Sequence, residues 1–394
     1  MSDRSRSRSR KQSKKSRARL RAWAVVNLAV LLAFSGWVYH NANATQTQAD
    51  LANRPIAIVS NVPKPQIASS APPTGSTAKA AAPQIPTKAQ ILALTSGPNA
   101  AKYFGVSAAN VPYAPSALQG LAAEARVSPD MVEYYVNWTQ QYNPNVVREA
   151  YAQGTIPVLT WESFAGLQGS TWNTLNQSTY SLSTIIDGDH DAYITSFAKA
   201  VATARLPVVI RLDHEMNGNW FPWSEGRNGN STGQYVEAWR HIWTLFQQAG
   251  ATNVIWDWAP NVIRGATISD LQELYPGDQY VDWIGLSAYQ DTETTPQELI
   301  SPSLDEIREF TQRPMLITET GARLGAAKPV YTTNFLAWLP SQPGIIGFIW
   351  NEMPPSDDTG DRTGDDWGFD TDPNSLAAFQ NGIKNLTLVK VPPV

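Results

Sequence analysis

The stretch that decides the fold is LPVVIRLDHEMNGNWFPW, residues 206–223. It begins as an apolar run rich in β-branched residues, which is typical of a strand buried on both faces of a parallel sheet. From Arg211 onward the run changes to charged, amide and aromatic residues. In α/β proteins such residues gather where parallel strands end. The segment therefore predicts a buried strand that delivers Glu215 to a functional edge of the sheet.

Seven further apolar or aromatic runs have strand character, and helical stretches separate them. These runs cover residues 102–108, 131–138, 156–162, 253–260, 281–289, 314–320 and 345–352. The alternation predicts parallel pairing, and eight strands over residues 97–394 favour an α/β fold of the (β/α)8 TIM barrel class. An open, doubly wound sheet also alternates and is the alternative fold.

Composition narrows the possible chemistry. The chain has 394 residues, of which 42% are hydrophobic and 15 are Trp, so we expect a folded protein with a substantial core. The chain contains no Cys, which excludes disulfides, thiol nucleophiles and Cys-ligated metals. Only four His are present, which disfavours a His-rich metal site. We expect neither a metal nor a cofactor.

The N-terminus predicts a membrane anchor. Residues 1–21 carry ten Lys or Arg, and residues 22–39, AWAVVNLAVLLAFSGWVY, carry no charge. Positive flanks lie on the cytoplasmic side of a span, so we expect a single-pass cell-membrane protein with a cytoplasmic N-terminus and an extracytoplasmic catalytic domain. This explanation fits the basic run better than a nucleic-acid-binding tail, and no nucleic-acid partner is expected. The alternative is a signal peptide cleaved near Ala44, which would release a secreted protein.

The segment 40–96 is rich in Ala, Pro, Thr, Ser and Gln. Such a composition buries too little apolar surface to offset the entropy of ordering, so we interpret it as a disordered linker. The catalytic domain that follows it is expected to be monomeric.

Two carboxylates are predicted to meet at the same end of the barrel. Glu215 follows the strand that begins at residue 206, and Glu319 lies in the TETG sequence that ends the run 314–320. A pair of carboxyls that flank a glycosidic bond suffices for its hydrolysis. Aromatic residues near strand ends supply flat faces for sugar rings, although about half of them are expected to belong to the core. The aromatic candidates are Trp138, Trp161, Trp220, Trp223, Trp258, Tyr289 and Trp350.

Residues 211–223, with HEMNGNW at their centre, resemble the acid/base motif of glycoside hydrolase family 26, which contains β-mannanases and related β-glycanases. The segments WDWAPN, VDWIGLSAY, ITETG, FIWNE and DDWGFD resemble the same family in order. The resemblance implies a retaining endo-β-glycanase with Glu215 as general acid/base and Glu319 as nucleophile. It also implies that His214, Trp220, Tyr289 and Trp350 line the sugar subsite; Trp161 and Trp223 are further substrate-binding candidates.

Arg211 shares the alternation of Asp213 and Glu215, so its side chain is expected inside the barrel. There it would pair with Glu319, or else form a purely structural ion pair with Asp213 or Asp257.

The substrate and the activity each keep an alternative. The mannanase branch of the family commonly has Pro after this Arg and extra His in the early strand loops, whereas this chain has Leu212-Asp213 and no His in those strands. A β-glucan or another β-linked polysaccharide is therefore as plausible a substrate as β-mannan. The alternative from a different class is a catalytically silent, membrane-tethered polysaccharide-binding barrel.

Two acidic segments raise the question of calcium. Residues 356–368 carry five Asp among glycines, and Asp187, Asp189 and Asp191 form a second group. The first segment lacks EF-hand spacing, so a solvated loop with Asp366 near the two glutamates is the favoured interpretation. The second group is typical of turn and capping residues rather than of a metal site.

Overall fold

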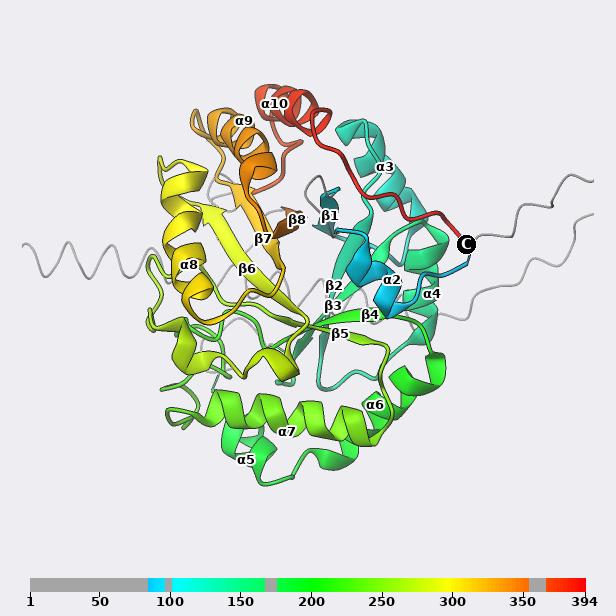
Figure 1. The fold of residues 1–394 in the computed structure, drawn as a ribbon, viewed down its shortest axis with the longest axis vertical. Coiled ribbons are helices and arrows are strands. Elements are labelled where there is room, and N and C mark those ends of the chain that lie inside the picture. The colour runs from blue at the N-terminus through cyan, green and yellow to red at the C-terminus, as the bar shows by residue number, and fades with distance from the viewer. Residues whose placement is uncertain (1–83, 96–100, 167–175, 354–365) are drawn as a thin grey trace, which may run out of the picture.

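The computed structural model is a ring of parallel strands surrounded by helices (Figure 1). It describes residues 84–95, 101–166, 176–353 and 366–394. The strands pair in chain order and the ring closes where β8 pairs with β1, which confirms the (β/α)8 barrel and excludes the open sheet. The strands are β1 (Tyr103–Ala108), β2 (Met131–Asn137), β3 (Ile156–Glu162), β4 (Val208–Leu212), β5 (Val254–Trp258), β6 (Trp283–Gln290), β7 (Met315–Ala322) and β8 (Ile345–Glu352).

Helices connect successive strands and cover the outside of the ring (Figure 1). They are α3 (Pro115–Ala125), α4 (Pro144–Ala152), α5 (Leu182–Ile186), α6 (Asp191–Ala204), α7 (Gln234–Gln248), α8 (Pro296–Phe310), α9 (Lys328–Trp338) and α10 (Pro373–Ile383). The connection between β5 and β6 differs, because it contains the 3-10 turns Leu271–Leu274 and Asp278–Tyr280.

Side chains alternate along each strand between the barrel interior and the helical layer. At the end where the strands begin, the interior is apolar, with the ring of Tyr103 5.6 Å from that of Trp283. Toward the end where the strands finish, called the mouth below, the interior becomes polar and contains Glu133, Arg211 and Glu319, all fully or almost fully buried. The apolar layer therefore supports a polar one directly beneath the mouth.

The helix α2 (Lys88–Ala93) packs on the barrel at the end opposite the mouth. Thr87 and Gln90 form a capping box at its start, and Ile91 is fully buried. Lys88 Nζ donates to the backbone oxygen of Val254 (2.6 Å) and to Asp282 Oδ2 (2.7 Å), and Tyr103 Oη donates to the backbone oxygen of Ile91 (2.9 Å). All three partners lie where strands begin.

The predicted linker, residues 40–96, is therefore wrong at its C-terminal end, because residues 84–95 belong to the folded domain. Composition missed this boundary because the segment completely buries only one apolar residue, Ile91. The contacts of Ile91 and Lys88 are with residues far along the chain, which composition does not reveal.

The predicted cytoplasmic tail, membrane span and cleavage site fall within residues 1–83 and lie outside the described residues. Among the residues that are described, no helix is long and apolar enough to span a bilayer.

Candidate active site

The end of β4 is shaped to turn Glu215 toward the mouth. The strand ends at Leu212, and Asp213 and Glu215 then adopt positive φ values of 44° and 54°. Such values are costly for residues with a side chain, and they cluster at functional sites. Three hydrogen bonds hold this bend: the Asp213 carboxylate accepts from both the N–H and the hydroxyl of Ser163 (2.8 Å each), and the N–H of Glu215 donates to the Ala259 oxygen (2.7 Å).

Glu319 lies on β7 in a fully buried position and accepts hydrogen bonds from three sides. Arg211 Nη1 lies 2.5 Å from its Oε1, Tyr135 Oη lies 3.1 Å from the same oxygen, and Tyr289 Oη lies 2.7 Å from Oε2. Asn351 Nδ2 in turn donates to Tyr289 Oη (2.7 Å). These contacts fix both oxygens of one carboxylate, which is the arrangement a nucleophile of defined direction requires.

Glu215 has a different environment, although it is also buried. Trp220 Nε1 donates to its Oε2 at 2.7 Å, and the Ser287 hydroxyl forms a second hydrogen bond to its carboxyl. Burial, followed by the negative charge of Glu319, raises the pKa of Glu215 to about 7, against the lowering effect of Arg211 and the two hydrogen bonds. A carboxyl with this pKa is protonated in a substantial fraction of molecules near neutral pH, and the protonated form is able to deliver its proton to a leaving group.

Arg211 connects the two glutamates. Its Nη1 reaches Glu319 directly and lies 3.3 Å from Glu133 Oε1, while its Nη2 donates to Ser287 Oγ at 2.7 Å. The predicted ion pair with Glu319 is therefore confirmed. Asp213 and Asp257 were the alternative partners of Arg211. The Asp213 carboxylate is hydrogen-bonded to Ser163, and burial raises the pKa of Asp257 to about 8.

His214 is fully buried beside Glu319, with its Nε2 3.9 Å from Glu319 Oε1. Its ring packs against Phe221, with centroids 4.5 Å apart, and against Tyr135 and Trp223. Burial and the charge of Arg211 hold the pKa of His214 well below its usual range. This direction of the pKa shift favours the neutral imidazole beside the two glutamates.

The structure separates the aromatic candidates into two groups. Trp220 and Tyr289 are half-buried at the mouth and contact the two glutamates. Trp223 is fully buried behind His214, where its Nε1 donates to the His214 oxygen (2.7 Å) and its ring stacks on Phe221.

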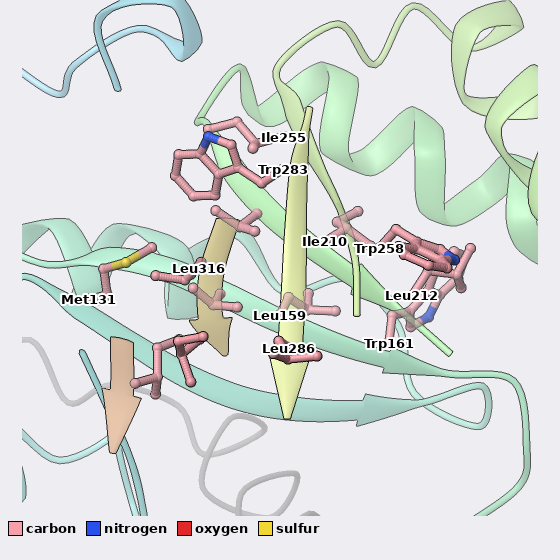
Figure 2. Packing of buried hydrophobic residues seen from close by; sticks show 14 of the residues in the cluster. Met131, Leu159, Trp161, Ile210, Leu212, Ile255, Trp258, Trp283, Leu286 and Leu316 are labelled. Carbon is pink, nitrogen blue, oxygen red and sulfur yellow. The ribbon is translucent and has the colours of Figure 1, made fainter. Parts of the chain in front are cut away.

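Trp161 and Trp350 do not reach the site. Trp161 stacks on Phe197 of α6 with ring centroids 4.4 Å apart, and Trp350 packs against Phe379 of α10 and Phe335 of α9. Both are fully buried, so these two predictions are wrong. Trp138 and Trp258 are also buried in aromatic clusters, beside Trp161 and Tyr275 respectively. Figure 2 shows Trp161 and Trp258 among the buried apolar residues of the core.

The reason for these errors is the alternation of side chains along a strand. On β3 the inward residues are Thr160, whose hydroxyl bonds to Glu133, and Glu162, so Trp161 between them points to the helices. On β8 the inward residue near the mouth is Asn351, which leaves Trp350 on the outside.

Sequence reasoning missed several residues of the site, among them Tyr135, Ser287, Asn351 and Trp367. The first three have inward positions that a strict count along each strand would have indicated. Trp367 follows an acidic segment, and its ring lies 4.8 Å from that of Tyr289, with the Arg323 guanidinium 5.9 Å from its centroid. Trp350 Nε1 fixes it by donating to its backbone oxygen (3.0 Å).

The part of the chain that the structure describes contains no group of three His, Asp or Glu side chains arranged to hold a metal ion. Asp366 lies 3.4 Å from Lys328 Nζ, and most of the acidic segment before it lies outside the described residues.

Comparison with known proteins finds a family model that matches the middle of the chain. Residues 130–314 match the model of glycosyl hydrolase family 26. This range includes Glu215, and Glu319 follows just after its end.

Three relatives carry different names. Endoglucanase H of Acetivibrio thermocellus is 27% identical over 267 residues, which are 64% of this chain and 27% of the relative. A mannan endo-1,4-beta-mannosidase of Bacillus subtilis is 30% identical over 151 residues, 34% of this chain and 39% of the relative. Beta-1,3-xylanase TXYA of a Vibrio species is 24% identical over 173 residues, 43% of this chain and 35% of the relative. The chain thus spans well under half the length of these relatives.

Solved structures share the fold. A GH26 beta-mannanase from Bacteroides ovatus superposes with a TM-score of 0.54 at 18% identity, covering 74% of this chain and 90% of that one. A modular endo-beta-1,4-mannanase from Cellulomonas fimi gives a TM-score of 0.58 at 18% identity, covering 75% of this chain and 73% of that one.

Proposed function

We propose that this chain, whose residues 130–314 match the model of glycosyl hydrolase family 26, hydrolyses a β-linked polysaccharide by double displacement, with Glu319 as nucleophile and Glu215 as general acid/base. The observation that carries the proposal is the asymmetry of the pair. Glu319 is compensated by Arg211 and fixed by two tyrosines, whereas burial raises the pKa of Glu215 to about 7.

In the first step, a Glu319 oxygen attacks the anomeric carbon while the Glu215 carboxyl gives its proton to the departing glycosidic oxygen. The ion pair with Arg211 and the hydrogen bond from Tyr289 hold the Glu319 carboxylate in the direction of attack. Attack then removes the negative charge that Arg211 compensates. The Trp220 N–H directs the Glu215 carboxyl, and it stabilises the carboxylate that remains once the proton has left.

In the second step, the Glu215 carboxylate takes a proton from water, and the water oxygen attacks the anomeric carbon and releases Glu319. Breaking the ester bond between Glu319 and the sugar restores the Glu319 carboxylate beside Arg211. The product keeps the anomeric configuration of the substrate.

A panel of polymers tests the activity. The full chain is incubated with mannan, mixed-linkage glucan, β-1,3-xylan and cellulose, and new reducing ends are measured. Proton NMR of the first product formed distinguishes retention from inversion. We expect cleavage of at least one polymer, with retention and with mid-chain products. Binding of the polymers without cleavage would instead identify a silent polysaccharide-binding barrel, and an inverted product would refute the role of Glu319.

We propose β-1,4-mannan or β-1,4-glucan as the substrate class. The names of the relatives include a mannosidase and an endoglucanase, which supports this range. Leu212-Asp213 and the absence of His from β2 and β3 make a glucan as plausible a substrate as a mannan. The polymer panel decides between them.

We also propose that residues 22–39 anchor the protein in the cell membrane, with the catalytic domain as an extracytoplasmic monomer. The ten cations before the apolar run and the net charge of −4 for the whole chain, which makes the remainder acidic, support this topology. Protease added to intact cells should then digest the catalytic domain while the N-terminus stays in the membrane fraction. Recovery of a soluble form that begins near Thr45 would refute the anchor and support cleavage.

A further inference from the structure

Glu162 is a third carboxyl at the mouth, and the proposed mechanism does not use it. It is the last residue of β3, and it follows Thr160 by two positions. The Thr160 hydroxyl donates to Glu133 inside the barrel, so Glu162 also points inward, one layer closer to the mouth. Its side chain retains 5% exposure.

The strand register places Glu162 directly above the polar layer. Thr160 pairs with Arg211 across β3 and β4, and Arg211 bonds to Glu319. Glu162 therefore lies one inward step beyond the row of the Arg211–Glu319 ion pair. The charges of Asp213, Arg211 and Glu319 all act on its carboxyl, which shows that these groups are close.

Within the described residues, no donor is committed to this carboxyl. The Asp213 carboxylate next to it is occupied by Ser163, and the Arg211 hydrogen bonds go to Glu319, Glu133 and Ser287. Burial, followed by the charge of Asp213, raises the pKa of Glu162 well above its usual range. Glu162 keeps a small exposed fraction at the mouth, so its carboxyl is open to a group that enters there.

Nothing in the packing accounts for Glu162. An apolar or amide side chain at this position would avoid placing a further carboxyl beside those of Glu319 and Asp213. A bound sugar would supply the hydrogen-bond donor that the described residues do not, because its donor groups would enter where the inward face of β3 reaches the mouth.

We infer that the Glu162 carboxyl contacts the sugar unit held against Glu319 and accepts a hydrogen bond from one of its donor groups, a hydroxyl or an ammonium. This inference rests on the proposed function, and it makes Glu162 a specificity-determining residue of the same site.

The test uses Glu162→Gln and Glu162→Ala in the full chain, with dinitrophenyl β-cellobioside and β-mannobioside as probes. Asp130→Asn is the matched control, because Asp130 is a buried carboxyl near the start of β2, at the other end of the barrel. We expect Glu162→Ala to lower kcat/KM about 10- to 100-fold, since removing one partner leaves a sugar donor unpaired in the closed site, which costs more than the hydrogen bond itself contributes. The control should leave kcat/KM unchanged, and thermal melting shows whether each variant is folded.

Monodeoxy analogues of the better probe then distinguish contact from an indirect effect. If Glu162 binds a hydroxyl, removing that hydroxyl lowers kcat/KM of the unchanged protein but not of Glu162→Ala, and Glu162→Gln keeps part of the activity. If it binds an ammonium, chitosan oligosaccharides are cleaved in preference to neutral ones, and Glu162→Gln loses that preference. Equal, additive losses for every analogue, or full activity of both variants on all probes, would overturn the inference.

The two proposals fail in different ways. If the unchanged protein cleaves no glycoside, the proposed function fails, and calorimetry with cello- and manno-oligosaccharides tests Glu162 by binding. Weaker binding to Glu162→Ala than to the unchanged protein would support the contact. Equal binding, or no binding to either protein, would overturn it.

Discussion

The two hydrogen bonds to Glu215 predict a measurable change in pH dependence. Replacing Trp220 by Phe keeps an aromatic ring but removes the N–H that lies 2.7 Å from Glu215 Oε2. That hydrogen bond favours the ionised carboxylate and lowers the pKa of Glu215. Its loss therefore raises the pKa, so that Glu215 keeps its proton to a higher pH.

The size of the shift follows from the difference between two kinds of hydrogen bond. A bond to a charged acceptor contributes about 1.5–3 kcal/mol and a bond to a neutral one about 0.5–1.5 kcal/mol, so the ionised form loses about 1 kcal/mol more. At about 1.36 kcal/mol per pKa unit, this corresponds to a rise of about 0.7 unit. Starting from about 7, the pKa of Glu215 should therefore rise clearly above neutrality.

The assay is the pH dependence of kcat/KM for an oligosaccharide, because a poor leaving group makes protonated Glu215 necessary. The alkaline limb should move upward in Trp220→Phe, and in Ser287→Ala for the same reason. Trp161→Phe is the matched control: it also exchanges Trp for Phe, but its ring packs against α6. An alkaline limb that stays in place or moves downward in both site variants would refute the assignment of Glu215 as the acid.

Further variants test the other parts of the site and the fold. Glu319→Ala should abolish turnover of every substrate, whereas Glu215→Ala should retain cleavage of dinitrophenyl glycosides. Azide should accelerate the reaction of Glu215→Ala and yield a β-glycosyl azide. Azide rescue of Glu319→Ala with retained configuration would contradict the roles proposed for the two glutamates. Arg211→Met should lower the free energy of unfolding, measured in denaturant, by about 3–5 kcal/mol, because it leaves buried Glu319 and Glu133 without their cation. An unchanged denaturation midpoint would show that the two carboxyls need no counter-charge. Ile91→Ala should cost about 2–4 kcal/mol of stability without changing KM, because Ile91 is fully buried far from the mouth; an unaltered melting temperature would mean that α2 does not stabilise the barrel.

The sequence was sufficient to predict the barrel and the two glutamates, because both depend on strong local signals. Each strand is a compact apolar run, and Glu215 and Glu319 stand where such runs turn polar. All eight predicted runs correspond to strands of the closed barrel, with ends that differ by a few residues. The roles of the two glutamates stay predictions until the variants are measured.

The side chains around the glutamates were harder to predict, because their direction depends on exact register. Trp161 and Trp350 are at strand ends, yet a one-residue step decides between the mouth and the helical layer. β7 adds a further complication, since its pairing shifts register between Ile317 and Thr320, the interval that contains Glu319. A periodic count along the sequence does not reveal such an irregularity.

The docking of α2 determines which way the barrel faces. Lys88 and Ile91 attach this helix where the strands begin, and Glu215 and Glu319 lie where they end. The chain that precedes residue 84 therefore joins the folded domain on the side opposite the catalytic pair. If residues 22–39 are held in a bilayer, a pull on the tether acts through the base of the barrel, and the glutamates can face outward to meet polymers arriving from the surroundings.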